Sequence, residues 1–317
     1  MPTFGDMVYH LGGVPAAAGL PLILGNVYFV SSVTGSSGND GTRDKPYLTV
    51  AQAIVNSTLN DCIIVMPGHT ETISSTVAGG SSLCFHVDSS HVNLTIWGVG
   101  NYDYMPTFTQ TAKIELKGAN CHLYNLKFVS GSTNLDQAMQ ITAKGVKVEG
   151  CRFEEVAAST YCYDECLITG ATANDAEGLH IANCLFYQDS AESSGGIIVP
   201  INQNNVKITN NRFYGTWTTG GGPIVLSSTV AVIGLEITHN LISNTQSSAT
   251  KSGITVLSDA AQGIVAYNCL VTAGSSAQNL GTGIQVSASG TIGVFENYVT
   301  GRPGESGRLD PAVFSTA

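Results

Sequence analysis

The acidic residues of this sequence are concentrated between positions 149 and 192. Nine of the 23 acids lie in that window, where Arg152 is the only basic residue. The nine are Glu149, Glu154, Glu155, Asp164, Glu165, Asp175, Glu177, Asp189 and Glu192. Glycosidases use two carboxyl groups about 5 to 10 Å apart, so loops in this window could present a glycan-cleaving pair. Such acids could also bind calcium or form a solvated loop, and the solvated loop is the interpretation we adopt.

The other residues that could do chemistry are isolated from one another. Trp97 and Trp217 could each stack on a sugar ring, but they are far apart in the sequence. His180 and His239 alternate with residues expected to point inward, so we predict that both histidines face outward. The sequence contains no serine nucleophile elbow, phosphate-binding loop or dinucleotide fingerprint. These residues therefore predict no particular reaction.

The bulk composition excludes several classes of protein. Hydrophobic residues make up 43% of the 317 residues, enough for a core, and charged residues only 11%. The net charge is −10 and the 13 Lys and Arg are thinly spread, so we predict no nucleic-acid partner. No apolar run approaches the 18 or more residues of a membrane span. The apolar segment 16–24 has no basic residue before it, so we predict no secretory signal.

A short pattern recurs along the chain. "VKITNNRFYG" at 206–215 returns as "VKVEGCRFEE" at 146–155, "LHIANCLFYQ" at 179–188 and "LEITHNLISN" at 235–244. Aligning the copies on their apolar residue gives one column of Phe128, Phe153, Phe186, Phe213, Ile242, Val271 and Val299. The steps between these positions are 25, 33, 27, 29, 29 and 28 residues. Internal periods of this length indicate a repeat architecture.

The repeat predicts a β-solenoid. Apolar residues are spaced by two, which excludes helices, and units of about 28 residues are shorter than the propeller blade of about 40. In a solenoid each coil stacks on the last with a spacing of about 4.8 Å, so equivalent residues lie over one another. The pattern recurs because each coil places the same kind of side chain in the same position of a continuous core.

A second column lies two positions before the first. It contains Cys151, Cys184, Asn211, Asn240, Cys269 and Asn297. Asparagine tolerates left-handed backbone angles and hydrogen-bonds to its neighbours, and cysteine is a small hydrophobe that fits the same space. We therefore predict free thiols, with a disulfide between stacked coils left open. "CYDEC" at 162–166 suggests a metal site, but the eight cysteines do not form two CxxC pairs, so we predict none.

The most specific pattern lies before the repeats, in residues 26–54 and 62–73. A strand, a "GNDGT" loop, a proline, a short amphipathic helix and a strand ending in Pro-Gly follow one another. This order resembles the start of pectin-lyase-like right-handed parallel β-helices, in which the helix caps the open end. The resemblance implies an all-β chain whose residues 26–301 form a single-stranded right-handed parallel β-helix with a short N-terminal capping helix. Without a cap, the open end would expose an edge able to pair with other chains.

The sequence lacks the motifs of two enzyme chemistries that this fold carries. Polygalacturonase-like hydrolases carry clustered Asp motifs and a Gly-His-Gly on the exposed sheet. The nearest match, Gly68-His69, is expected in the first coil, without the partner carboxylates of that motif. Pectate lyases need calcium-binding Asp residues with an Arg on one sheet. Arg152 and Arg212 occupy neighbouring positions in different coils, but no acidic set repeats beside them. We therefore predict a protein that is not an enzyme and uses no cofactor or metal, with glycan cleavage as the main alternative.

Residues 1–25 are predicted to form an extended arm outside the solenoid. The segment has three Pro, several Gly and almost no charge. It is too short to form a core of its own, and its apolar side chains would be exposed to water unless a partner covered them. We predict that its apolar side chains anchor the protein to a partner. They are Phe4, Met7, Tyr9, Leu11, Leu20, Leu22, Ile23 and Leu24. The predicted division is an arm at 1–25, the β-helix at 26–301 and a C-terminal tail or cap at 302–317.

An arm followed by a β-helix resembles tailed-phage virion proteins, and a capsid decoration (cement) protein most of all. This resemblance implies a homotrimer at the surface of the phage particle, bound to the major capsid protein or another virion protein. The protein would be made in the host cytoplasm without a signal peptide. A tailspike or receptor-binding β-helix that binds or cleaves host surface polysaccharide is the alternative. A cellular β-helix enzyme or adhesin is a third class.

Overall fold

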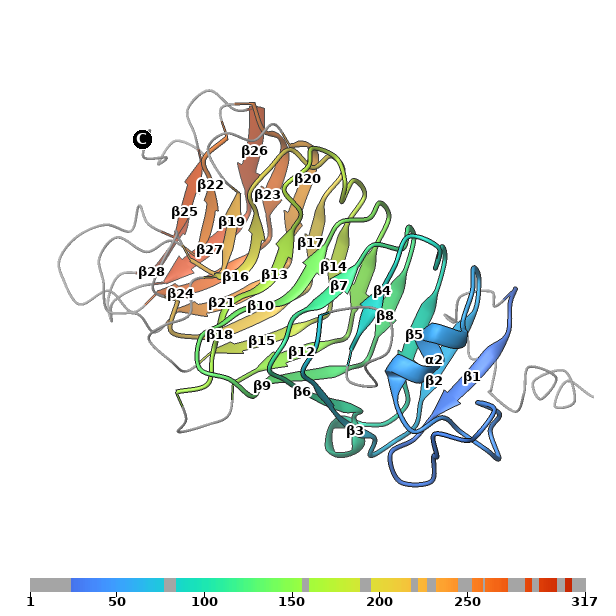
Figure 1. Ribbon diagram of the computed structural model, residues 1–317. Helices are drawn as coiled ribbons and strands as arrows, with labels where there is room; N and C mark the ends of the chain where they lie inside the picture. The colour runs from blue at the N-terminus through green and yellow to red at the C-terminus, as the bar shows by residue number, and fades with distance from the viewer. Residues whose placement is uncertain are drawn as a thin grey trace, which may run out of the picture.

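The chain winds into a right-handed parallel β-helix, in which successive coils contribute strands to three sheets (Figure 1). The computed structural model describes residues 24–76, 84–155, 160–188, 195–217, 222–226, 232–244, 253–258, 260–272, 283–286, 291–300 and 306–309. The predicted all-β solenoid is thereby confirmed. No helix in these described segments is long and apolar enough to cross a membrane.

In the described part of the chain, the first and second sheets each have ten strands. The first sheet contains β1 (Val27–Val30), β2 (Cys62–Val65), β5 (Thr95–Gly98), β8 (His122–Tyr124), β11 (Lys147–Glu149), β14 (His180–Ala182), β17 (Lys207–Thr209), β20 (Ile233–Thr238), β23 (Gln262–Ala266) and β26 (Thr291–Phe295). The second contains β3 (Thr70–Ile73), β6 (Thr107–Gln110), β9 (Lys127–Ser130), β12 (Arg152–Glu154), β15 (Leu185–Gln188), β18 (Arg212–Gly215), β21 (Leu241–Asn244), β24 (Cys269–Thr272), β27 (Asn297–Thr300) and β28 (Ser306–Leu309).

The third sheet has eight strands within the described segments. It contains β4 (His86–Val87), β7 (Ile114–Leu116), β10 (Leu135–Ile141), β13 (Tyr163–Thr169), β16 (Gly195–Val199), β19 (Ile224–Leu226), β22 (Ile254–Val256) and β25 (Ile284–Val286). A short 3-10 helix, η1 (Tyr102–Tyr104), lies between β5 and β6. Among the described strands, every pair in the three sheets is parallel except β27 with β28, which is antiparallel. The strand β28 falls within the predicted C-terminal tail or cap.

The helix α2 (Val50–Asn56) lies at the N-terminal end of the solenoid, as predicted (Figure 1). Thr49 begins it with a capping box: the Gln52 backbone N–H donates to the Thr49 hydroxyl, and the Gln52 side chain accepts from the Thr49 backbone. Val50, Ala53 and Ile54 on its inner face are buried in the main core. The helix therefore covers apolar side chains at the end of the stack that no further coil covers.

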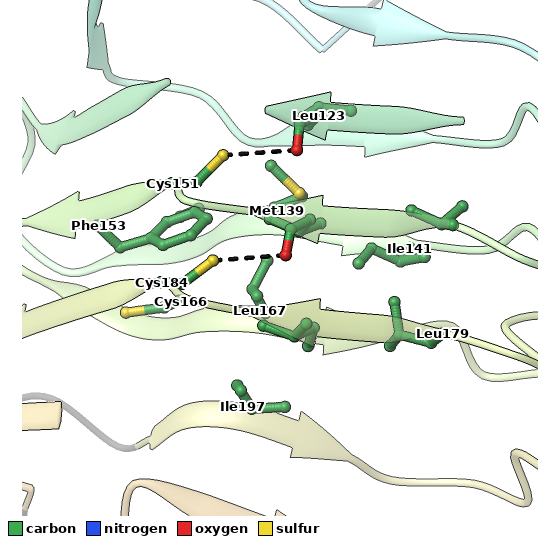
Figure 2. Close-up of a cluster of buried hydrophobic side chains, with 14 of the residues drawn as sticks. Leu123, Met139, Ile141, Cys151, Phe153, Cys166, Leu167, Leu179, Cys184 and Ile197 are labelled. Atoms are coloured by element: carbon green, nitrogen blue, oxygen red, sulfur yellow. Dashed lines mark hydrogen bonds between the residues drawn. The ribbon is translucent and has the colours of Figure 1, made fainter. Parts of the chain in front are cut away.

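A column of aromatic side chains runs through the core beneath the second sheet. Phe128, Phe153, Phe186 and Phe213 are in register and buried, and the Phe186 and Phe213 rings stack at 4.6 Å between centroids. Phe153 and its neighbours from other coils fill the interior in Figure 2. Ile242 continues the column as predicted, but the next member is Leu270 and not Val271.

The predicted position of Val271 is wrong by one residue. Leu270 is buried and pairs with Ile242, whereas Val271 is 38% exposed. Successive strand residues point to opposite faces of a sheet. An error of one residue in the alignment therefore assigns an outward-facing side chain to the core. Val299 pairs with Leu270 and so keeps its predicted place in the register.

The second predicted column is an asparagine ladder, and it carries the same slip. Asn211, Asn240, Asn268 and Asn297 follow Cys151 and Cys184, so Asn268 takes the place predicted for Cys269. The Asn240 side-chain amide donates to the Asn268 oxygen at 3.0 Å, and the Asn268 amide donates to the Asn297 oxygen at 2.9 Å. The left-handed backbone that we expected at this column lies one residue earlier in each coil, at positions such as Asn210.

The cysteines of the ladder are buried thiols. The Cys151 thiol donates to the Leu123 carbonyl, and the Cys184 thiol donates to the Val148 carbonyl, over Sγ–O distances of 3.8 and 3.4 Å (Figure 2). Burial raises the pKa of the Cys184 thiol well above its ordinary value, so this thiol stays protonated. Cys269, one residue beyond the ladder, is exposed.

Candidate functional site

A groove of about 740 Å³ crosses the outer face of the second sheet, beside its corner with the first sheet. Its floor is formed by side chains of three consecutive coils, on β12, β15 and β18. One rim is formed by the corner residues Gly150, Asn183 and Asn210. Tyr102 and Met105, from the loop between β5 and β6, also line it. The groove therefore runs across the strands, along the axis of the solenoid.

Strand alternation explains which side chains form the floor. Phe153, Phe186 and Phe213 point into the core, so the residues on either side of each Phe point outward. The residue before it gives one row, Arg152, Leu185 and Arg212, and the residue after it gives a second row, Glu154, Tyr187 and Tyr214. All six of these residues line the groove.

Arg152 is held in place by the aromatic residue beside it. Its guanidinium lies 4.0 Å from the centroid of the Tyr102 ring, and its Nη2 donates to the Tyr102 hydroxyl at 3.1 Å. It also forms an ion pair with Glu154, and Lys127 contacts the same carboxylate at 2.8 Å. The buried Nε of Arg152 has no hydrogen-bond partner in the described part of the chain. A charged donor left in this way is costly unless a ligand or water satisfies it.

Arg212 differs from Arg152 in its surroundings. It is exposed, and within the described segments no carboxylate forms an ion pair with it. It lies two coils from Arg152, a separation of about 10 Å at the usual strand spacing. The charged residues lining the groove are two arginines and one glutamate, so the groove is locally positive on a protein of net charge −10.

Tyr187 and Tyr214 add an aromatic surface to the floor. They pair in register on β15 and β18, and both are half-buried. The site therefore combines cationic groups and flat rings on neighbouring coils. Such a surface can bind an extended ligand that carries both anionic groups and apolar ring faces.

The sequence carries a signal for the floor of this groove. The repeated triplets "RFE", "LFY" and "RFY" place Arg or Leu before each Phe, and Glu or Tyr after it. Once Phe is assigned to the core, both flanking positions must face outward, and the repeat stacks them in rows. Tyr102 had no such signal, because it reaches the groove from another coil.

The acidic residues of the 149–192 window do not lie in one loop, so that prediction is wrong. Glu149 lies on the first sheet near His122, with 3.4 Å between the carboxylate and the ring nitrogen. Glu154 is in the groove, and Asp164 and Glu165 are on β13 of the third sheet. Burial and the nearby Asp136 raise the pKa of the Glu165 carboxyl.

Two further acids of that window have structural partners. Asp175 accepts from the Gln203 amide at 2.8 Å, and Glu177 forms an ion pair with Lys144 at 2.8 Å. Asp189 and Glu192 lie outside the described residues. In the segments that the structure describes, no group of three or more His, Cys, Asp and Glu could hold a metal ion. The window therefore divides among three sheets because each coil passes through all of them.

His69 has a partner carboxylate after all. Its Nε2 donates to the Glu71 carboxylate at 3.0 Å, and its Nδ1 accepts from the Ser32 backbone N–H at 2.9 Å. Glu71 also accepts from the backbone N–H of Val50, the first residue of α2. His69 is fully buried, so this pair fastens the capping helix and does not face a ligand.

The remaining predicted residues lie away from the groove. Trp217 is buried against Phe213 and cannot stack on a sugar, and Trp97 is half-buried on the first sheet. His180 lies on the outer side of the first sheet, half-buried, with a ring nitrogen 3.0 Å from the Thr209 hydroxyl. His239 is at the surface, as predicted.

The predicted anchoring arm falls almost wholly outside the described residues. This applies to Phe4, Met7, Tyr9, Leu11, Leu20, Leu22 and Ile23. Leu24 is described and its side chain is 71% exposed. The role of these residues as a partner anchor, and the division into arm, β-helix and tail, stay predictions.

Comparison with known proteins supports the fold and leaves the family open. No protein-family model matches the chain, and no curated protein matches its sequence. A solved structure of a rhamnogalacturonan lyase aligns with a TM-score of 0.51 and 13% identity, over 92% of this chain and 87% of the lyase. The GH136 lacto-N-biosidase from Eubacterium ramulus aligns at 11% identity, over 87% of this chain and 68% of that one. The TM-score of that alignment is 0.37.

The prediction that this chain is not an enzyme is contradicted by that comparison. The solved structure that shares its fold over nearly the whole length is a polysaccharide lyase. At 13% identity the likeness shows the pectin-lyase-like β-helix fold and not the reaction. Lack of a recognised motif in the sequence was therefore not sufficient to exclude catalysis.

Proposed function

We propose that this protein binds an acidic polysaccharide in the groove over β12, β15 and β18. The observation that carries the proposal is the arrangement of Arg152, Arg212, Tyr187 and Tyr214 on three consecutive coils. Arginine forms charge-assisted, often bidentate, hydrogen bonds to carboxylates, and tyrosine rings pack on the apolar faces of sugars. A uronate-containing chain presents both kinds of group at regular intervals.

The direction of the groove supports a polymer as the ligand. Coils advance by about 4.8 Å, similar to the length of one sugar unit, so a chain laid along the axis meets equivalent positions repeatedly. The shared fold with a rhamnogalacturonan lyase, whose name gives a polysaccharide as its substrate, supports the same ligand class. The exposed Arg212 is the group that a uronate carboxylate would engage first.

Binding in the groove favours the receptor-binding form of a phage virion protein. A groove for a glycan serves recognition of a host surface, whereas capsid decoration through the N-terminal arm makes no use of it. The virion location, the homotrimer and the partner of the arm rest on the sequence resemblance, and we propose them on that ground.

Affinity electrophoresis of the full chain through gels containing polygalacturonate, rhamnogalacturonan or neutral dextran tests the proposal. The two acidic polysaccharides should retard the wild type and dextran should not. Arg212→Gln should weaken retardation about tenfold, because it removes one charge-assisted contact. Arg43→Gln is the matched control, since it removes the same charge from an exposed loop far along the chain.

Absence of retardation by either acidic polysaccharide would overturn the proposal. Equal weakening by Arg43→Gln and Arg212→Gln would also overturn it, because the effect would then come from net charge. The same samples should be assayed for new reducing ends after incubation. Such ends, lost in Arg212→Gln and kept in Arg43→Gln, would extend the function from binding to cleavage.

A further inference from the structure

The corner between the first and second sheets has an unusual pair of residues near the C-terminal end. In each coil the residue before the ladder position has a positive φ, and in four successive coils it is Asn125, Gly150, Asn183 and Asn210. Asn and Gly tolerate this left-handed backbone readily. In the next three coils the position is occupied by His239 at φ 59°, Tyr267 at φ 58° and Glu296 at φ 52°. A tyrosine in this conformation is disfavoured.

The two side chains form a stacked and exposed aromatic pair. Their ring centroids are 5.0 Å apart and their planes differ by 21°. Tyr267 is 50% exposed, His239 is also at the surface, and the Phe295 ring packs edge-on against Tyr267 at 5.7 Å. The pair is thus held in one orientation while about half of the Tyr267 surface meets water. Rigid, partly exposed aromatic rings are a common feature of binding surfaces.

This pair continues the rim of the groove. Asn183 and Asn210 line the groove, and the strand register places His239 one coil beyond Asn210 and Tyr267 two coils beyond it. At about 4.8 Å per coil, Tyr267 lies about 10 Å past the end of that rim. A chain that follows the groove along the axis therefore reaches the aromatic pair next.

We infer that His239 and Tyr267 form a second sugar-contacting subsite, which extends the groove by two coils. The inference rests on the proposed function, because its ligand is the same acidic polysaccharide. Tyr267 adopts a left-handed backbone conformation that Asn would adopt with less strain. Strained backbone of this kind is often found at functional sites, and here it presents an aromatic ring at the surface. The subsite makes affinity depend on the length of the bound fragment.

The test compares galacturonate fragments of two lengths with four forms of the full chain. A fragment of about three sugars covers the groove alone, and one of about eight also reaches the subsite, given a coil spacing of about 4.8 Å. His239→Asn and Tyr267→Asn install the residue that Asn183 and Asn210 already provide at this corner, so both variants should fold. Tyr124→Ser, at a partly exposed tyrosine on the outer face of the first sheet, is the control.

Titration calorimetry should show at least tenfold tighter binding of the long fragment by the wild type. Tyr267→Asn should lose most of that advantage and leave the short fragment unaffected, while Tyr124→Ser changes neither. Unchanged long-fragment binding in both Asn variants would overturn the subsite and leave the groove intact. Failure of the wild type to bind either fragment would overturn the proposed function as well. A wild-type oligomer that Tyr267→Asn converts to monomers in sedimentation would assign the pair to a subunit interface and overturn the subsite.

Discussion

The Arg152 guanidinium lies over the Tyr102 ring, 4.0 Å from its centroid, although the two residues are 50 positions apart in the chain. This contact joins the segment before β6 to strand β12. These two elements belong to coils that are separated by one further coil, which contains β9. The contact fixes the orientation of one cationic group in the groove. The contact also gives Tyr102, which is 74% exposed, a defined partner at the surface.

Removing the Tyr102 ring should weaken glycan binding without destabilising the fold. Tyr102→Ala removes a cation–π contact worth about 0.5 to 2 kcal/mol and leaves Arg152 free to move. Tyr102→Phe keeps the ring and loses only the hydroxyl, so it should bind nearly as wild type. The measurement is retardation by polygalacturonate, with the thermal midpoint as a check on folding. Equal binding by Tyr102→Ala and wild type would show that the contact does not organise the groove.

The core register can be tested with two neighbouring substitutions. Leu270→Ala should lower the unfolding free energy by about 2 to 5 kcal/mol, because it empties a buried position in the column. Val271→Ala should change it by less than about 0.5 kcal/mol, since surface substitutions seldom do more. Urea unfolding of both variants provides the comparison. A larger loss of unfolding free energy for Val271→Ala than for Leu270→Ala would support the register predicted from the sequence.

Much of this fold could be predicted from the sequence because a solenoid repeats its constraints. Phe128, Phe153, Phe186 and Phe213 identify their own column, since aromatic residues in four successive units admit one alignment. The alignment slipped at Val271 because "NCLV" offers Asn or Cys as the ladder residue and Leu or Val as the core residue. Only the backbone pairing distinguishes the two choices.

The groove was harder to predict than the core. Its floor follows from the residues that flank each Phe, but its end wall depends on Tyr102, which is remote in the sequence. Acidic residues that are close in the sequence, such as Glu154 and Glu165, lie on different sheets, because each coil turns through all three. In a β-helix, proximity along the chain predicts side-chain proximity poorly, and the position within the coil predicts it well.

The asparagine ladder should contribute strongly to stability. The Asn240 amide donates to Ile208 and Asn268, and its oxygen accepts from the backbone and side chain of Asn211. Asn240→Ala leaves these buried groups unsatisfied, at about 1 to 3 kcal/mol for each group that water cannot reach. Urea unfolding should therefore show a loss of at least about 2 kcal/mol. Asn244→Ala at the other end of β21 offers a comparison outside the ladder, at a buried side chain that accepts from the backbone N–H of Trp217 at 3.3 Å. A loss below about 0.5 kcal/mol for Asn240→Ala would mean that water satisfies the ladder.

Two histidines on the outer face of the first sheet should make stability fall in mild acid. Burial lowers the pKa of His122 and of His180 below the ordinary value of 6.5, although Glu149 opposes the shift for both. Below pH 6.5 the unfolded chain binds protons that the folded chain does not, so the unfolding free energy decreases as the pH falls toward the folded-state pKa values.

The double variant His122→Gln and His180→Gln should show a weaker pH dependence in that range. Glutamine keeps a hydrogen-bonding group near Glu149 and Thr209 but does not titrate. Urea unfolding at a series of pH values below 6.5 measures the slope for each protein. A slope identical to that of the wild type would mean that other groups cause the acid sensitivity.

The N-terminal arm should attach the protein to its partner. Full burial of an apolar side chain contributes about 1.5 to 3 kcal/mol before ordering costs, so half of the eight predicted anchors would contribute several kcal/mol. Deletion should stop at residue 23, because the backbone N–H of Gly25 donates to the Asn60 carbonyl at 3.0 Å beside the first strand. The truncated chain should stay folded and keep its glycan binding, yet fail to sediment with particles of the proposed virion. A second form, with Leu20→Ser and Leu22→Ser in the full chain, separates loss of apolar contact from loss of length. Wild-type occupancy of the particles by the truncated chain would place the attachment surface on the β-helix.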